Sequence, residues 1–114
     1  MAINWDAPIE IRDFRNGDWF WIQKSVWQDK NLSASDKIIY GTIAFFANQK
    51  SQTAWPALTT LASFSGISYR QSYRSLKQLE KLLYIRIIRG GGRGKPNQYQ
   101  LLKIKGDMMA EFNN

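Results

Sequence analysis

The chain has 114 residues, of which 44% are hydrophobic, and a net charge of +7 at pH 7. This length suits a single domain with a modest core, and no apolar run approaches the roughly 18 residues of a membrane span. There is no cysteine and no histidine, which excludes disulfides, the common zinc sites and imidazole catalysis. We therefore expect no catalytic residue, no cofactor, no metal and no small-molecule ligand. No secretory signal is evident, and we expect a cytoplasmic protein.

The positive charge lies in the second half of the chain. Residues 1–69 hold six Lys/Arg and six Asp/Glu, whereas residues 70–105 hold ten Lys/Arg and one acidic residue, Glu80, a local charge of +9. A basic half beside a neutral half indicates a polyanionic partner, and nucleic acid is the commonest one. An anionic membrane surface is the alternative. The basic helix at 68–83 argues against a membrane partner, because its apolar face is continuous with a core.

Residues 1–31 form an aromatic-rich extension that holds four of the five tryptophans. Period-2 alternation at 9–12, the turn signal Asn16-Gly17 and strand-forming residues at 19–22 predict a β-hairpin over about 9–22. The tryptophans either pack this hairpin onto the domain or form an aromatic contact surface for a partner or for stacked bases.

A first helix is predicted to begin after Ser33 and to run to about Asn48. Ser33 suits the N-cap, and Asp36 lies at the third helical position, where its carboxylate favours the positive end of the helix dipole. Apolar residues recur at helical spacing, at Ile39, Tyr40, Ile43, Phe46 and Ala47. The pattern indicates a core helix without catalytic groups.

A very short strand at 53–55 and a second helix are predicted next. Pro56 suits the first position of this helix, because a proline lacks the N–H that would be unpaired there. Gly66 marks its end, since glycine readily takes the positive φ of a tight turn. The inner face carries Leu58, Leu61 and Ala62. A short helix, a turn with glycine and a further helix together make a helix-turn-helix pattern.

The third predicted helix, at 68–83, has one apolar and one cationic face. Ser68 suits the N-cap, and Gln71 can complete a capping box. The predicted buried face consists of Ser72, Ser75, Leu76, Leu79, Leu82 and Leu83. The opposite arc of about 60°, flanked by Tyr73 and Gln78, carries Arg70, Arg74, Lys77 and Lys81. Such a face is often only solvated surface, but its place after the helix-turn pattern favours a binding role.

A second hairpin is predicted around the glycine-rich segment 90–97, which carries Arg93 and Lys95. Its strands come from the β-rich runs 84–89 and 98–105. A nucleotide-binding P-loop is excluded, because Arg89 stands where that loop needs glycine and Pro96 where it needs serine or threonine. We interpret the hairpin as a mobile cationic wing that lies along a phosphate backbone. A plain disordered turn is the alternative.

In this order the elements resemble a winged helix-turn-helix domain, over about residues 19–104. The likeness is closest to the winged-helix domains of replication and regulatory proteins from bacteria, phages, plasmids and other mobile elements. It rests on Leu32-Ser33, Tyr40-Gly41, Trp55-Pro56, Leu61-Ala62, Gly66-Ile67-Ser68, the Leu76/Leu79 pair, Asn97-Gln98-Tyr99-Gln100-Leu101 and the lead-in segment 20–26. Ala57 stands in place of the usual serine, which removes a phosphate contact. Leu83 stands where glycine often ends the helix, so the helix either runs longer or lacks the left-handed glycine cap.

The resemblance implies an α+β fold, a three-helix core with a two-stranded wing, to which the sequence adds the N-terminal hairpin. It also implies sequence-specific binding to double-stranded DNA, as the origin-binding domain of a replication initiator of a mobile element or, alternatively, as a phage or plasmid repressor. RNA binding, a protein-docking role and an enzyme remain as alternatives. A docking module would not need the basic segment. The only grouped acidic residues, which an enzyme would require, are Asp6, Glu10, Asp13 and Asp18.

The candidate DNA-binding residues lie on the helix at 68–83 and on the wing. The N-terminal half of the helix is the part that reaches base edges in helix-turn-helix proteins. The residues are Ser68, Tyr69, Arg70, Gln71, Tyr73, Arg74, Lys77, Lys81, Arg89, Arg93 and Lys95. We expect one structural domain, divided into an extension (1–31), a winged core (32–105) and a tail (106–114). We further expect the protein to pair with itself through residues 1–31, as a homodimer or as adjacent copies on repeats.

Overall fold

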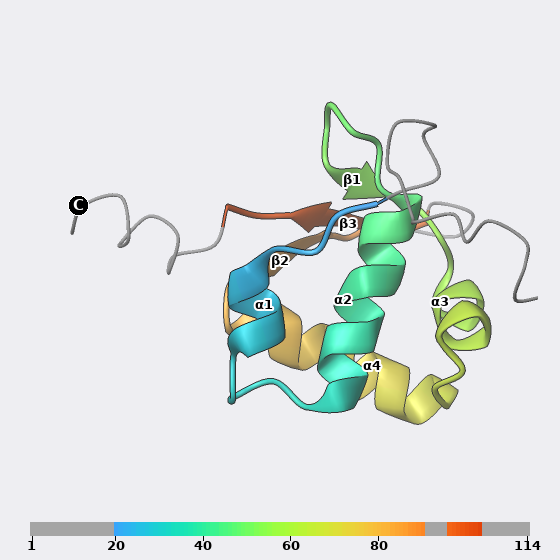
Figure 1. The fold of residues 1–114 in the computed structure, drawn as a ribbon. Coiled ribbons are helices and arrows are strands. Elements are labelled where there is room, and N and C mark those ends of the chain that lie inside the picture. Colours follow the sequence, from blue (N-terminus) through green and yellow to red (C-terminus); the bar gives the residue numbers. More distant parts are fainter. Residues whose placement is uncertain (1–19, 91–95, 104–114) are drawn as a thin grey trace, which may run out of the picture.

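A computed structural model describes residues 20–90 and 96–103 of the chain, which form four helices and a small antiparallel sheet (Figure 1). In chain order the elements are α1 (Lys24–Gln28), α2 (Ala34–Phe46), β1 (Thr53–Ala54), α3 (Leu58–Ser65), α4 (Tyr69–Lys81), β2 (Ile85–Ile88) and β3 (Gln98–Leu101). Helices α2, α3 and α4 form the core and strands β2 and β3 form the wing, so the predicted α+β winged helix-turn-helix fold is confirmed.

Helix α2 begins as its sequence predicts. The backbone N–H of Asp36 donates to Oγ of Ser33 at 3.1 Å, and the backbone N–H of Ser33 donates to the carboxylate of Asp36 at 3.0 Å. This capping box satisfies two N–H groups that the helix leaves without an internal partner. The helix ends at Phe46, two residues before the predicted end, and Ile39 and Ile43 on its inner face are fully buried.

Helix α3 begins two residues later than predicted. Pro56 lies before the helix, Ala57 is the N-cap in an extended conformation, and Leu58 is the first helical residue. The fixed φ of proline suits extended backbone as well as a first helical turn, and here the chain is still leaving β1. Gly66 ends the helix at φ 72°, in the left-handed region that glycine favours, as predicted.

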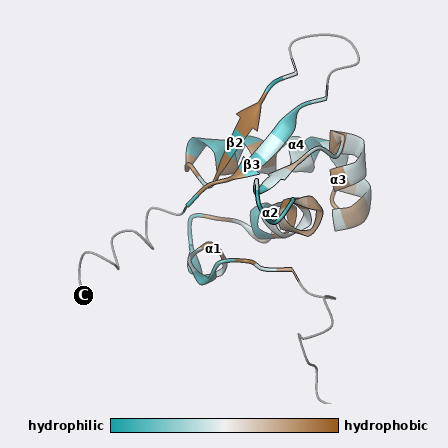
Figure 2. Ribbon diagram, turned by 90° about the horizontal axis from the view of Figure 1, so that it is seen from above, coloured by the Kyte–Doolittle hydropathy of each residue, from teal (hydrophilic) through white to brown (hydrophobic). Residues whose placement is uncertain are grey.

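The three strands form one antiparallel sheet in the order β1-β3-β2. Tyr99 on β3 lies opposite Ala54 of β1 and Ile87 of β2 in the register. Figure 2 shows α2 in the middle of the molecule, with α4 on one side and α1 on the other. One core joins all these elements: Val26, Leu32, Ile39, Tyr40, Ile43, Ala54, Leu61, Leu76, Leu79, Tyr84, Ile85 and Tyr99.

The lead-in to the core differs from its prediction. Of the hairpin expected over about 9–22, residues 9–19 lie outside the described part, and residues 20–22 form no strand. Instead the chain turns into α1 directly after Gln23, and Val26 is fully buried. Tertiary packing decides here: the ring of Phe20 lies edge-on to Phe45, with centroids 5.6 Å apart. Strand propensity is weak against such contacts.

Candidate DNA-binding face

The start of α4 is fixed by Ser68. The backbone N–H of Gln71 donates to Oγ of Ser68 at 3.2 Å, so the predicted N-cap is confirmed. The reciprocal half of the expected capping box is wrong, because the amide of Gln71 donates along the helix to Oγ of Ser75 at 3.5 Å. Helix α4 is therefore capped by one side chain at its N-terminus.

The buried face of α4 is the predicted one along most of its length. Ser72, Ser75 and Leu79 are fully buried, and Leu76 nearly so. Oγ of Ser72 donates to the carbonyl of Ile67 at 3.4 Å, which ties the helix to the turn before it. The small serines let neighbouring backbone approach closely, so α4 packs against both α2 and α3.

The end of α4 corrects the prediction for Leu83. This residue was expected on the buried face, but it is 64% exposed and has φ 64°. The N–H of Leu83 donates to the carbonyl of Glu80 at 3.1 Å, and the N–H of Tyr84 donates to that of Leu79 at 3.0 Å. These are the two hydrogen bonds of a Schellman motif, whose left-handed position usually holds glycine. The helix therefore ends at Lys81, with leucine in a strained conformation.

The outward face of α4 is cationic and aromatic. Tyr69 and Tyr73 are 56% and 51% exposed. Nζ of Lys77 lies 5.6 Å from the ring centroid of Tyr73, within the range of a cation–π contact. The remaining cations on this face are all exposed, and within the described residues they form no ion pair: Arg70, Arg74 and Lys81.

At the base of the wing, Arg89 pairs with an acidic residue of α4. Its Nη1 lies 3.3 Å from Oε2 of Glu80, and its Nη2 lies 3.5 Å from Oε1. Nζ of Lys77 lies 3.8 Å from the same Oε1. Sequence reasoning did not indicate these partners of Glu80, because Arg89 lies nine residues further along the chain. Arg93 and Lys95 lie outside the described residues.

Asn97 fixes the other side of the wing base and was not among the predicted site residues. Its Oδ1 accepts a hydrogen bond from the backbone N–H of Gly90 at 3.1 Å, which joins the two ends of the glycine-rich segment. Its side chain also hydrogen-bonds to Tyr99. Burial raises the pKa of Tyr99, and the bond from Asn97 opposes that rise.

A hollow of about 470 Å³ lies between α4 and the wing base. Its polar lining comes from α4, from the base of the wing and from β3. The residues are Tyr69, Tyr73 and Lys77 on α4, Arg89 and Asn97 at the wing base, and Tyr99 on β3. The sequence holds no motif for such a site, because the residues meet only once β2 and β3 pack beside α4. None of the described residues that line it is acidic.

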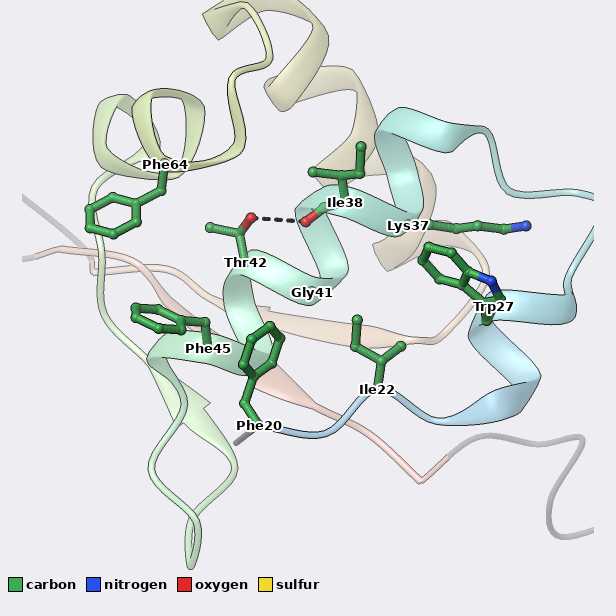
Figure 3. A pocket seen from close by; sticks show the side chains of 9 residues that line it. All are labelled: Phe20, Ile22, Trp27, Lys37, Ile38, Gly41, Thr42, Phe45 and Phe64. Carbon is green, nitrogen blue, oxygen red and sulfur yellow. Dashed lines mark hydrogen bonds between the residues drawn. The ribbon is translucent and has the colours of Figure 1, made fainter. Parts of the chain in front are cut away.

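An apolar groove of about 320 Å³ lies on the other side of α2 (Figure 3). The residues of α2 that line it alternate with those that face the core. Gly41 allows the chain to approach, since a Cβ there would lie 2.9 Å from Cδ1 of Ile22. The lining is Phe20, Ile22, Trp27, Lys37, Ile38, Gly41, Thr42, Phe45 and Phe64.

The fold, together with the cationic and aromatic face of α4, places the chain in the winged helix-turn-helix class. Residues 30–85 match the model of a family described as a helix-turn-helix domain. No match was found among curated proteins. Within the residues that the structure describes, no helix has the length and apolarity to traverse a bilayer.

Two solved structures are similar to this one in fold. The first, a Rep-DNA complex, is 16% identical, with a TM-score of 0.57 over 86% of this chain and 88% of that chain. The second, the N-terminal domain of a DNA binding protein, is 15% identical, with a TM-score of 0.58 over 93% of this chain and 95% of that chain. At this identity the likeness concerns the fold.

Proposed function

We propose that the chain binds double-stranded DNA sequence-specifically, with α4 in the major groove and the wing along the backbone. The carrying observation is the outward face of α4, where tyrosines and arginines are exposed beside a cationic wing in a winged helix-turn-helix fold. The 13 residues of α4 span about 20 Å, enough to lie across a major groove. The likeness to a fold that was solved as a Rep-DNA complex supports the same use.

Within this proposal the two halves of α4 have different roles. The N-terminal half reaches base edges, and arginine pairs well with O6 and N7 of guanine. Its residues are Ser68, Tyr69, Arg70, Gln71, Tyr73 and Arg74. Lys77 and Lys81 lie one to three turns further along the helix and contact phosphates. The wing residues Arg89, Arg93 and Lys95 add backbone contacts that carry no sequence information.

As biological role we propose the origin-binding domain of a replication initiator of a mobile element. Footprinting on the DNA that neighbours the coding sequence tests this role directly. Protection of repeats in a replication origin would support it, whereas protection of a single operator that overlaps a promoter would replace it with repression. Competition between duplex, single-stranded DNA and RNA tests the binding itself. A preference for single strands or for RNA would contradict duplex recognition.

We also propose that the protein acts as a pair of copies joined through the apolar groove and residues 1–31. Specific binding needs about 4–10 kcal/mol of discrimination over random DNA, and one small winged helix offers few base contacts to supply it. Figure 2 shows α1 and α4 on opposite sides of α2, and the groove has Ile22 and Trp27, from the α1 side, in its lining (Figure 3). A second copy seated there leaves the DNA-binding face free. Exposed aromatic side chains such as Trp27 and Phe64 give it the composition of an interface core.

A further inference from the structure

The two cations that line the hollow between α4 and the wing are both held by one carboxylate. Lys77 and Arg89 line the hollow, and each lies within ion-pair distance of Glu80. We propose that the hollow seats one backbone phosphate of the bound duplex, and that Glu80 is the residue that limits its affinity. This inference rests on the proposed DNA binding and assigns a role to the single acidic residue of the basic half.

Half of the residues that line the hollow are apolar, and the polar ones suit a phosphodiester. Guanidinium and ammonium groups are the usual phosphate partners, and tyrosine hydroxyl and asparagine amide groups also donate to phosphate oxygens. All of these are present, in Arg89, Lys77, Tyr69, Tyr73 and Asn97. Its volume of about 470 Å³ lies in the range of pockets that take small organic ligands, so it has room for a phosphate with its sugar.

The position of the hollow also suits the backbone of DNA. It adjoins the N-terminal half of α4, whose residues reach into the groove in helix-turn-helix proteins. Pro96 and Asn97 at the base of the wing also line it. A strand whose bases face Arg70 and Arg74 therefore passes its backbone along the wall formed by Tyr69 and Tyr73.

Glu80 competes with a phosphate for the same donors. The guanidinium of Arg89 meets both oxygens of the carboxylate, at 3.3 and 3.5 Å, which is the two-pronged geometry that it would otherwise offer to a phosphate. The side chains of Arg89 and Glu80 are 55% and 30% exposed. Such solvent-exposed pairs are weak, so a phosphate can displace the carboxylate. The exchange costs part of the binding free energy on every DNA sequence.

This cost shortens the time that the protein spends on random DNA. Contacts to phosphates strengthen binding to random and specific DNA alike, whereas base contacts act only on the specific site. A carboxylate that weakens one phosphate contact lowers non-specific binding, and the protein is released sooner from random sequence. Glu80 therefore sets the overall affinity and the release rate without contacting a base, and it leaves the ratio of specific to random binding unchanged.

The test is Glu80→Gln, with affinities measured for the footprinted site and for random duplex over a range of salt concentrations. We expect binding to both DNAs to tighten about 3- to 10-fold at low salt, and the slope of log affinity against log salt to steepen by about one. Glu111→Gln is the matched control, since it makes the same charge change in the C-terminal tail. It should alter affinity less than twofold.

A double-mutant cycle locates the effect at the ion pair. In an Arg89→Ala background, Glu80→Gln should tighten binding by only about a third of its effect in the parent protein, because Lys77 alone remains to be released. Unchanged affinity in Glu80→Gln, or an equal gain in Glu111→Gln, would overturn the inference. Failure of the parent protein to bind any duplex would instead overturn the proposed function. A thermal unfolding curve for each variant confirms that it is folded.

Discussion

The phenol of Tyr84 donates a hydrogen bond to the carboxylate of Asp29 and so joins the end of α4 to the C-cap of α1. The two residues are 55 positions apart in the chain. The hydrogen bond from Tyr84 is the main cause that lowers the pKa of Asp29, and the N–H of Asn31, at 2.7 Å, adds to it. Burial, and then the bond to Asp29, raises the pKa of Tyr84 to about 12. One contact thus fixes both the lead-in helix and the start of the wing.

Replacing Tyr84 by Phe should lower the free energy of unfolding by about 1–2 kcal/mol, since a hydrogen bond to a charged acceptor is lost. Tyr84 remains protonated in the folded state, so its contribution is full below its ordinary pKa of 10.0 and is lost as the pH rises toward about 12. The contribution of ionised Asp29 is present above pH 3.8 and is lost as the pH falls below it. Urea unfolding across the pH range measures the loss of stability at both its alkaline and its acidic limits.

Tyr73→Phe is the matched control for that experiment, because Tyr73 is half exposed and its hydroxyl has no partner among the described residues. It should leave stability and its pH dependence unchanged. If Tyr84→Phe retained the pH dependence of the parent protein at both limbs, the bond to Asp29 would not be a source of stability.

Leu83→Gly should stabilise the domain, although it removes a hydrophobic side chain. Leu83 has φ 64° and is largely exposed, so little packing is lost. A left-handed conformation costs a non-glycine residue about 1–2 kcal/mol, and Leu83→Gly removes this cost. The greater freedom of glycine in the unfolded chain reduces the gain by about 0.4–1 kcal/mol. We expect a net gain of about 0.5–1 kcal/mol in urea unfolding. Leu82→Gly, one position earlier at φ −86°, should destabilise instead.

The contrast between Ser33 and Leu83 shows which features the sequence could predict. Ser33 with Asp36, Ser68 with Gln71, and Gly66 act within four residues, so their caps and turn follow from spacing alone. Leu83 belongs to the apolar pattern of its helix, and its exposure follows from where the helix ends. That end is set by Tyr84, which the core and the carboxylate of Asp29 hold in place.

Contacts between distant segments lay beyond sequence reasoning in the same way. Helix α1 carries no strong helix signal, and it forms where Val26 enters the core. The pairing of Glu80 with Arg89, and the bond from Gly90 to Asn97, depend on how β2 and β3 return along α4. The candidate face could therefore be predicted as a helix surface, whereas the hollow beside it required the structure.

Replacing Arg70 or Arg74 by Ala should cost about 1–3 kcal/mol on the specific site and much less on random duplex. Both arginines are exposed and form no ion pair among the described residues, so their removal should leave the fold intact. Fluorescence anisotropy with the footprinted site and a scrambled duplex measures the two affinities. Equal losses on both DNAs would mean that the arginines only neutralise the backbone.

The wing variant Arg93→Ala plus Lys95→Ala provides the contrasting case for that measurement. It removes two cations that we propose to contact phosphates, so binding should weaken on all duplexes alike. The slope of log affinity against log salt should shrink by about two. An unchanged slope would place both side chains away from the DNA.

The last prediction concerns self-association through the groove on the side of α2 opposite α4. Analytical ultracentrifugation should find the intact chain as a dimer and a version that begins at Phe20 shifted toward monomer, because residues 1–19 carry Trp5 and Trp19. In the intact chain, Ile38→Ser should weaken the dimer as well, since Ile38 lines the groove and is 43% exposed. Lys50→Ser, in the exposed turn before β1, is the control and should leave it unchanged. A folded monomer at high concentration that binds one unrepeated site at full affinity would contradict the paired arrangement.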